Sequence, residues 1–553
     1  MISLLPVLTC AGLSGAPADL AAAHRPPAAF HQIAFVSDPL SHGTVGDGLL
    51  SLNEAIRLHN GTLDVALLSL AEQNQVSLLP GSVTTDVTWI EIDSEAIPTI
   101  TLQQDLESIV NTPFGLFIRG SGSRVNLDLS APGVTRGIHS TSSSLIVQGL
   151  GFVGGVAGLE VVQADATGQP GCTVIRCKFE NLSQFGVRVE GTLPGGVGRL
   201  IVEDSTFVNV SDALVFDESP AGRTTIFEAR DVRMEGVVDG FDFDCGGGGT
   251  ARFTMDRCVV EASATGLDVA APAVNGRSML VEGTHLRVRA PLCARIDGAA
   301  DTVLWANGSM WSLLAPAGGT ALQLGGVGQQ VYGDLRELRC EGDVAIAAGG
   351  APLPLQIRNM RARDGAVALS TQPGQSLTVS ESRFIDCDVD SVGTGAVGLN
   401  NSSFEGGSVG ASTPAGLLQA DGCFLPTPGP GVVVTSALAQ AHLGSLDPLQ
   451  DDVSLGGTLQ LQLDLPAGLV GAVALGAVPQ FLPLAPAPFY LYVDPAGVFF
   501  LPGLYSGQQV ASWQAPIQPL LYGAQLVVQA VVLPIGIQAP PIQFPPGWRL
   551  ELR

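Results

Sequence analysis

The chain has 553 residues, which is more than one ordinary hydrophobic core holds, so either several domains or a solenoid is expected. Charged residues are only 14% of the sequence, which also contains 69 Gly and 37 Pro, a balance typical of stacked coils joined by many turns. The formal net charge of −25 argues against nucleic acid as a partner, because such binding depends on Lys and Arg that neutralise phosphates.

The first 18 residues are typical of a signal peptide. Their centre is apolar, and they end in Ala16-Pro17-Ala18, a small-residue pattern of the kind that signal peptidases cleave. We therefore expect an exported protein, either secreted or held at the cell surface. A Pro- and Ala-rich spacer and an N-terminal cap are predicted to follow, over residues 19–99.

One helix is predicted in this cap, over residues 51–60. Ser51 with Glu54 three residues later forms a capping box, Ile56 lies on the apolar face, and Gly61 supplies the stop. The segment from Gly46 to Gly61 resembles the DGxxSLREAI segment of CSLREA-type bacterial surface proteins, which precedes β-helix repeats in that family. The first coil of a β-helix exposes an unpaired strand edge and an open core, so we expect this helix to cover them.

A repeat follows, in which a short apolar strand, a polar turn and an aromatic or aliphatic anchor precede a second strand. Its period of 20 to 28 residues is typical of stacked architectures. A Gly-φ-x-φ strand comes seven or eight residues after many anchors, as at Gly158–Val161 and Gly186–Val189. The expected anchors are Phe152, Phe179, Phe207, Met234, Val260, Leu286, Met310, Leu338, Met360, Phe384, Phe404 and Phe424.

These patterns predict an all-β protein whose main domain is a right-handed parallel β-helix of about twelve or more coils over residues 100–442. The chain resembles secreted bacterial β-helix proteins of the pectate-lyase-like type. The alternating strands of residues 443–553 predict a C-terminal antiparallel β-sandwich that serves as an accessory domain. Five prolines between Leu465 and Val493 argue against a membrane-spanning helix there.

Eight cysteines lie beyond the predicted signal peptide, and several stand beside the repeat's anchor. We interpret them as buried thiols, although disulfides remain open in an exported chain. The sequence contains no CxxC pair and no HxxxH, so neither zinc nor a histidine-based metal site is expected. Nothing in the sequence indicates the oligomeric state.

Residues at one repeat position stack in columns about 4.8 Å apart in a β-helix, so the sequence alone proposes outward clusters. The x position of the Gly-φ-x-φ strand places Asp242 next to Asp268, with Asp244 on the same face and Arg295 one coil further on. Paired carboxylates can share a proton, act as acid and base, or hold a divalent cation. The bare turn Gly246–Gly249 is expected to leave them open. The other interpretation is a solvated acidic patch.

A second column lies three residues before the anchor and reads Arg176, Asp204, Asp231, Arg257. These are the residue types with which β-helix polysaccharide lyases provide a base and bind calcium, so a binding role is one interpretation. However, the longer WxDH and RxPxxR motifs of those enzymes are absent. A charge-compensating turn ladder is the alternative.

Two further groups remain as candidates. Asp386, Asp388 and Asp390 carry the hard oxygen ligands that Ca²⁺ prefers, so calcium is the one cofactor to consider. Trp305 and Trp311 can form a sugar-stacking platform if they are exposed, although core and corner positions are the more typical interpretation at this spacing.

Two functions follow from these candidates. The first is an exported β-helix protein with a structural, adhesive or glycan-binding role, and a polysaccharide or a cell-surface component as its partner. The second is a glycan-active lyase or hydrolase that uses Asp242, Asp244 and Asp268. The fold alone does not decide between them.

Overall fold

The computed structural model describes most of the chain from residue 32 onward. The predicted signal peptide, Gly246–Gly249 and the expected anchor Phe424 lie outside the described residues. The described ranges are 32–41, 45–78, 87–110, 115–141, 144–163, 171–191, 197–218, 224–245, 250–271, 278–298, 302–326, 329–348, 355–372, 376–412, 417–423, 425, 428–437, 445–449, 452–465, 469–476, 479–484, 489–493, 498–518, 525–534 and 548–552.

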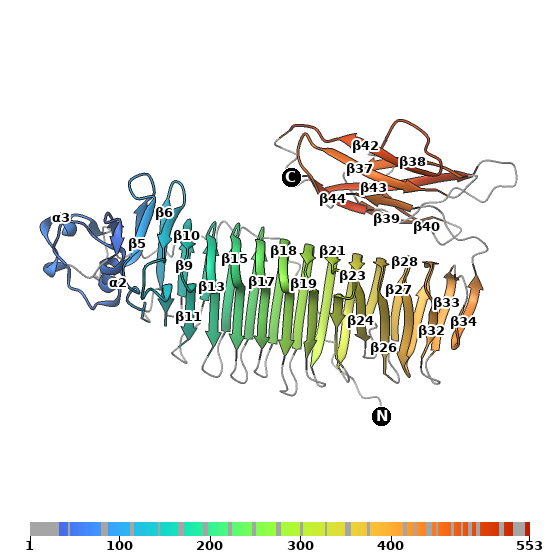
Figure 1. Ribbon diagram of the computed structural model, residues 1–553, viewed down its shortest axis with the longest axis horizontal. Helices are drawn as coiled ribbons and strands as arrows, with labels where there is room; N and C mark the ends of the chain where they lie inside the picture. The colour runs from blue at the N-terminus through green and yellow to red at the C-terminus, as the bar shows by residue number, and fades with distance from the viewer. Residues whose placement is uncertain are drawn as a thin grey trace, which may run out of the picture.

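The N-terminal cap contains the predicted helix, α2 (Leu52–Asn60). The Ser51 hydroxyl accepts from the backbone N–H of Glu54, and the Glu54 carboxylate accepts in return from the backbone N–H of Ser51 at 2.9 Å. Gly61 ends the helix in the left-handed conformation at φ 70°. The apolar face of α2 belongs to the same buried core as the first coils, so the helix closes this end of the solenoid (Figure 1). The other small elements of the cap are the 3₁₀ helix Val65–Leu67, α3 (Leu70–Gln73) and β3 (Val76–Leu78).

The main domain is a parallel β-solenoid, which confirms the predicted class. Each coil lays strands on three faces, and each strand pairs in parallel with its counterpart one coil away (Figure 1). The N-terminal coils consist of short strands. Those on the first face are β1 (Gln32–Val36), β4 (Val87–Asp93), β6 (Leu116–Ser121), β9 (Ser144–Gln148), β12 (Gly171–Ile175), β14 (Val197–Glu203) and β16 (Thr224–Arg230). On the second face they are β2 (Leu40–Ser41), β5 (Thr99–Leu102), β7 (Val125–Asp128) and β10 (Leu150–Val153), and on the third face β8 (Arg136–Ser140) and β11 (Ala157–Gln163).

In the middle of the solenoid, long strands bend around one or two corners and contribute to several faces. They are β13 (Lys178–Gly191), β15 (Thr206–Glu218), β17 (Arg233–Cys245), β18 (Thr250–Ala271), β19 (Ser278–Arg289), β21 (Val303–Leu314), β23 (Gln330–Glu341) and β25 (Leu355–Arg363). Their partners on the third face are β20 (Leu292–Gly298), β22 (Thr320–Leu324), β24 (Asp343–Ala348) and β26 (Ala366–Thr371). Shorter strands finish the rod: β27 (Ser376–Ser380), β28 (Arg383–Ile385), β29 (Asp388–Gly393), β30 (Ala396–Asn400), β31 (Ser403–Glu405), β32 (Val409–Ala411), β33 (Leu417–Cys423) and β34 (Val432–Ala437).

The regular solenoid has about nine turns, compared with the twelve or more coils expected from the repeat. Parallel pairing continues beyond these turns into the shorter strands at both ends, for example from β10 to β7 and from β28 to β31. The sequence pattern counts these short coils together with the regular ones, which explains its larger number.

The apolar anchors stack as a column in the core. The rings of Phe152, Phe179 and Phe207 lie parallel at 4.8 and 4.7 Å between centroids, and all three are fully buried. The glycine of the Gly-φ-x-φ strand makes room for them. A Cβ at Gly158 would lie 2.8 Å from Cδ1 of Phe179, and one at Gly186 would lie 2.6 Å from Cδ1 of Phe207. These glycines are therefore required by close packing against the rings.

Four of the expected anchors are assigned to the wrong position. Strand pairing aligns Val260 with Val288 and not with Leu286, and Met310 is itself a corner residue at φ 58°. The aligned positions in the next coils are Leu313, Cys340 and Ala362, two or three residues after the expected ones. Residues one and three positions after the corner both point inward, so an apolar pattern alone does not distinguish them. The column returns to the expected residues at Phe384 and Phe404.

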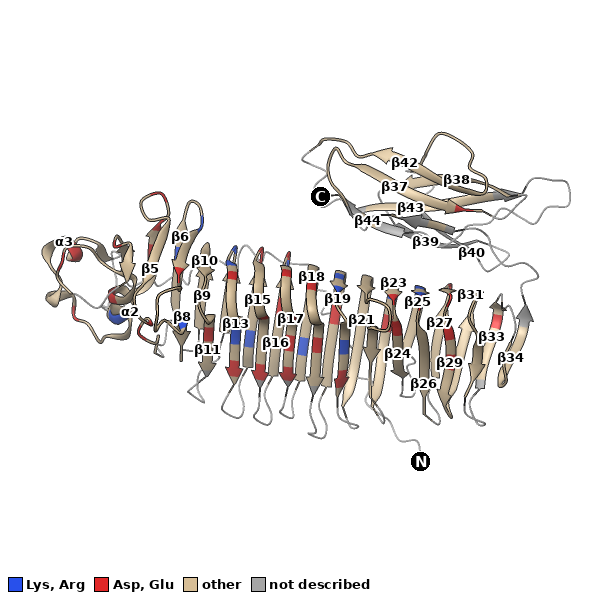
Figure 2. Cartoon of the chain, viewed as in Figure 1, with Lys and Arg blue, Asp and Glu red and all other residues tan. Residues whose placement is uncertain are grey.

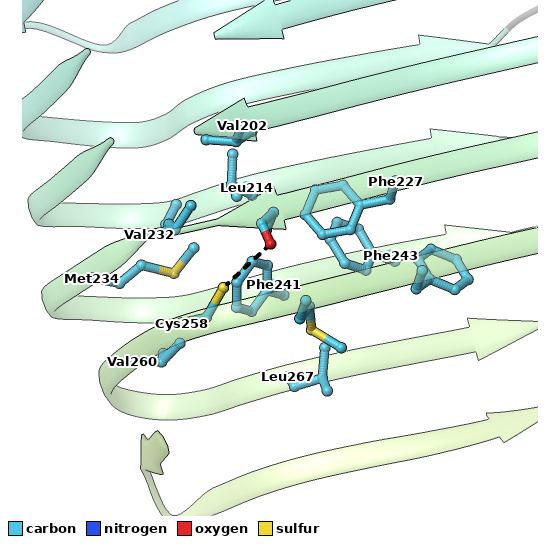
Figure 3. Close-up of a cluster of buried hydrophobic side chains, with 14 of the residues drawn as sticks. Val202, Leu214, Phe227, Val232, Met234, Phe241, Phe243, Cys258, Val260 and Leu267 are labelled. Atoms are coloured by element: carbon cyan, nitrogen blue, oxygen red, sulfur yellow. Dashed lines mark hydrogen bonds between the residues drawn. The ribbon is translucent and has the colours of Figure 1, made fainter. Parts of the chain in front are cut away.

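Seven cysteines are buried free thiols, as interpreted from the sequence, while the side chain of Cys245 lies outside the described residues. Cys258, for example, lies among Met234, Phe241 and Leu267 in the core (Figure 3). Burial raises the pKa of Cys177 to about 11 and that of Cys258 to about 12, so both remain protonated thiols at neutral pH. The buried free cysteines are Cys172, Cys177, Cys258, Cys293, Cys340, Cys387 and Cys423.

The C-terminal region forms a β-sandwich, as expected. Leu461 of one sheet and Val473 and Val528 of the other share one buried core that is separate from the solenoid core. The pairing is antiparallel apart from one short parallel pair, β36 with β44, where fully antiparallel sheets were expected. Sheet one contains β35 (Ser445–Pro448), β37 (Thr458–Asp464) and β42 (Gln508–Gln514), and sheet two contains β36 (Asp452–Val453), β44 (Trp548–Leu552), β43 (Gln525–Pro534), β38 (Leu469–Gly476) and β41 (Phe499–Phe500). A hairpin of β39 (Pro479–Leu484) and β40 (Phe489–Val493) accompanies them.

Candidate functional site

The outward column on the third face has the register predicted from the sequence. Strand pairing aligns Asp242 of β17 with Asp268 of β18, and Asp268 with Arg295 of β20. Acidic and basic residues recur on the strands in this part of the rod, from β13 to β19 (Figure 2). Along the coils the column reads Glu160, Arg188, Val215, Asp242, Asp268, Arg295 and Gln323.

Asp242 is the most perturbed carboxyl group of this column. It is half-buried, and burial raises its pKa to about 6, with further contributions from Asp268, Asp217 and other nearby carboxylates. Among the described residues it forms no ion pair or hydrogen bond through its side chain. A carboxyl group with a pKa near neutrality can accept and release a proton under physiological conditions.

Asp268 has the opposite environment. The guanidinium of Arg295 holds both of its oxygens, with Nε donating to Oδ1 at 2.9 Å and Nη2 donating to Oδ2. The hydrogen bond to Asp268 in turn raises the pKa of Arg295. Asp268 is therefore ion-paired, whereas Asp242 has no cationic partner among the described residues.

Asp244 lies on the same face, two residues beyond Asp242, and is exposed. Its strand partners are Asp217 and Ala270. Asp217 is bound by Arg188, whose Nη2 lies 2.9 Å from Oδ2. The three predicted carboxylates therefore occupy two neighbouring strands of one sheet face, and the structure brings Asp242 and Asp268, but not Asp244, into register.

The second predicted column forms a corner of the solenoid. Arg176, Asp204, Asp231 and Arg257 all have the left-handed backbone conformation, with φ between 49° and 54°. Arg257 binds Asp231 through two hydrogen bonds of 2.7 Å, so charges on adjacent coils compensate one another. Burial, assisted by Asp231, raises the pKa of Asp204. These residues form the bend of each coil, and neighbouring charges pair across coils. This is the geometry of the turn ladder that was the alternative interpretation.

The three aspartates proposed for calcium are dispersed. Asp386 lies at a corner at φ 51°, and Asp388, which accepts from Ser408 Oγ at 2.7 Å, begins β29 with Asp390 two residues later. In the part of the chain that the structure describes, no group of three or more His, Cys, Asp or Glu side chains is arranged to hold a metal ion. The proposed calcium site is thus not assembled there.

The two tryptophans have different environments. Trp311 is a core residue whose indole Nε1 donates to the carbonyl of Gly283 at 3.0 Å, as expected. Trp305, for which a core or corner position was favoured, instead faces outward with 36% of its surface exposed. It stacks on Tyr332 of the next coil at 4.9 Å between ring centroids. Tyr332 was not predicted as part of a site, although it lies 27 residues, one repeat period, after Trp305.

Polar groups flank this aromatic pair. Asn307, two residues after Trp305, accepts through Oδ1 from the backbone N–H of Asp334 at 3.3 Å. Asp334 Oδ2 accepts a hydrogen bond from Nε of Arg336 at 2.9 Å. The site thus presents one exposed indole, backed by the buried ring of Tyr332, beside amide, carboxylate and guanidinium groups.

Comparisons with known proteins identify no family. No family model matches the chain, and no curated protein matches its sequence. Among solved structures, the chain is similar to the enzymatically active domain of bacteriophage CBA120 tailspike protein 2, at 10% identity and a TM-score of 0.23, with 86% of this chain and 76% of that chain covered. At this TM-score the likeness carries no argument about activity. The class of protein, a parallel β-solenoid, is defined by its strand pairing.

A membrane-spanning helix was not expected. Within the described ranges, no helix is long and apolar enough to cross a bilayer.

Proposed function

We propose that this protein is an exported β-solenoid that binds glycans at the cell surface or outside the cell. The observation that carries the proposal is the outward indole of Trp305, which is 36% exposed and stacks on the buried ring of Tyr332, with Asn307 and Asp334 beside it. Sugar rings bind to an exposed indole because their C–H faces are apolar, while their hydroxyls need nearby polar side chains. The rigid solenoid fixes these groups in place.

The experiment is a glycan panel presented to the purified protein and to two variants. Trp305→Ala is expected to weaken binding by about tenfold or more, which corresponds to ~1.4 kcal/mol. Phe35→Ala is the matched control, because it removes an aromatic side chain that is 44% exposed on another coil. Binding that survives Trp305→Ala, or that falls equally in both variants, would contradict the proposal.

A second candidate function has one observation in its favour. The raised pKa of Asp242, opposite Asp268, suits a general acid of a glycan-active lyase or hydrolase. On this proposal Asp242 transfers the proton, while Arg295 holds Asp268 through two hydrogen bonds. Release of reducing or unsaturated ends from a glycan panel, abolished by Asp242→Asn, would support it. A folded wild-type protein that is inert across the panel would contradict it.

A further inference from the structure

The outward column of the third face extends toward the N-terminus and brings three residues of different chemistry together. The bridge between Ile109 and Ser140 places Ser108 beside His139 on the neighbouring coil. His139 of β8 is in turn the strand partner of Glu160 of β11. Serine, histidine and glutamate therefore follow one another on three successive coils.

Their side chains contact one another in that order. Ser108 Oγ lies 2.7 Å from His139 Nδ1, and His139 Nε2 lies 3.7 Å from Glu160 Oε2. A carboxylate facing Nε2 favours the tautomer that carries its proton on that nitrogen. Nδ1 is then the lone pair that accepts the Ser108 hydroxyl. This is the arrangement of a nucleophile, a base and an orienting acid, with the two imidazole nitrogens exchanged relative to the serine protease triad.

Neighbouring residues hold the group in place. Arg136 Nη1 binds Glu160 Oε2 at 2.9 Å, and Asp105 accepts from the backbone N–H groups of Thr135 and Arg136 at 2.6 and 3.2 Å. Burial and the charge of Arg136 lower the pKa of His139, outweighing Glu160 and Asp105. His139 is consequently neutral at pH 7, which is the form that can take a proton from serine.

We propose that Ser108 is a nucleophile activated by His139, and that this site cleaves small carboxylic esters. Ser108 Oγ attacks the ester carbonyl while its proton passes to His139 Nδ1. The alcohol leaves with that proton, and an acyl group remains on Ser108. Water then attacks the acyl group, His139 takes a proton from the water and returns one to Ser108, and the carboxylic acid is released.

The surroundings suit this step. Ser108 and His139 are both partly exposed, so a small acyl group can reach the hydroxyl. The Arg136 side chain is 38% exposed, and its Nη1 donates to Glu160 Oε2 on the Nε2 side of the His139 ring. Glu160 acts through His139 and is a positioning residue. The site is separate from Trp305 and Tyr332, and the proposal does not depend on glycan binding.

The test is labelling of the intact protein with a fluorophosphonate, followed by peptide mass spectrometry. We expect an adduct on Ser108 that Ser108→Ala abolishes and that forms about 100-fold or more slowly in His139→Gln. p-Nitrophenyl acetate hydrolysis is expected to fall in parallel. In Glu160→Gln the pH of half-maximal labelling should shift downward, because Glu160 raises the pKa of His139.

Ser144→Ala is the matched control, since Ser144 is an exposed serine at the start of β9, the next strand in the chain after β8, and it should leave labelling unchanged. Circular dichroism establishes that each variant is folded. A folded wild-type protein in which Ser108 is unlabelled would overturn the proposal, as would labelling that is equal in wild type and His139→Gln. Either result would show that the three side chains form only a polar ladder.

Discussion

Asp242 and Asp268 lie directly opposite each other on β17 and β18, yet Arg295 binds Asp268 and leaves Asp242 without a cation among the described residues. Like charges on facing strand positions destabilise a sheet. The structure lessens this repulsion by pairing one carboxylate and by favouring the protonated form of the other. Burial raises the pKa of Asp242 to about 6, and repulsion from Asp268 and other nearby carboxylates adds to this shift.

The first prediction concerns the pH dependence of stability. The pKa of Asp242 is about 6 in the folded protein and ordinary, about 3.9, in the unfolded chain, so the folded state binds more protons between these values. Stability is therefore expected to fall as the pH rises through this window and to level off above about pH 6. Asp242→Asn should remove this loss, raising the free energy of unfolding by about 1–3 kcal/mol at pH 8.

Urea unfolding of wild type and Asp242→Asn between pH 4.5 and 8 measures the effect. The difference between the two proteins should grow with pH. Asp388→Asn, which neutralises an exposed carboxylate at the start of β29, controls for the change in net charge. A gain in Asp242→Asn that is the same at every pH would rule out this explanation.

The second prediction concerns the packing of Trp311. Its indole fills the space above Gly283 and Gly308, where an added Cβ would lie 2.7 Å from the indole at either position. Trp311→Ala is expected to lower the free energy of unfolding by about 3–5 kcal/mol, because it leaves a large cavity in the core. Gly283→Ala should also destabilise the protein, by about 1–3 kcal/mol, because the core is overpacked.

Trp305→Ala is the control for this prediction. Its side chain is partly exposed and stacks on Tyr332, so the expected loss is only about 1 kcal/mol. Denaturant unfolding monitored by far-ultraviolet circular dichroism compares the variants. Equal losses in Trp305→Ala and Trp311→Ala would contradict the assignment of one tryptophan to the surface and the other to the core.

Much of this fold could be predicted because a solenoid repeats its local environment. The period placed Asp242 opposite Asp268 in the correct register, since each coil adds one strand and side chains alternate along it. The helical cap was predictable from its capping box at Ser51 and its stop at Gly61. In each case the information is local in sequence or repeats at a fixed interval.

The remaining features depend on contacts that the period does not encode. Leu286 and Val288 both point into the core, so only strand pairing shows which of them continues the anchor column. Arg295 makes the environment of Asp268 different from that of Asp242. Its pairing with Asp268 depends on the conformation of its side chain, which the repeat period does not specify. Ser108 lies outside the regular repeat, so no column predicted from the sequence connected it with His139.

The third prediction separates the two roles of the corner column. Arg176 and Asp231 both have positive φ, which costs a non-glycine residue about 1 kcal/mol, but only Asp231 has a bidentate partner shown here, Arg257. Arg176→Gly is therefore expected to stabilise the protein by about 0.5–1 kcal/mol. Asp231→Gly should stabilise it less or destabilise it, because Arg257 loses its partner. Thermal unfolding of the two variants is the measurement, and a larger gain in Asp231→Gly would contradict the ladder.

The fourth prediction concerns the buried thiols. The core cysteines are free, and burial raises the pKa of Cys177, Cys258 and Cys293 to about 11 to 12, so little reactive thiolate forms at pH 8. Iodoacetamide should leave these three unmodified in the folded protein and modify them rapidly in 6 M guanidinium, with mass spectrometry locating each adduct. No reducing agent should be needed for the reaction in denaturant, because these thiols are not in disulfides.

Modification at equal rates in both conditions would mean that the solenoid core opens readily. A requirement for prior reduction would instead mean that disulfides replace the thiols, which the Sγ–H contact of Cys177 with the carbonyl of Ile175 at 3.4 Å argues against.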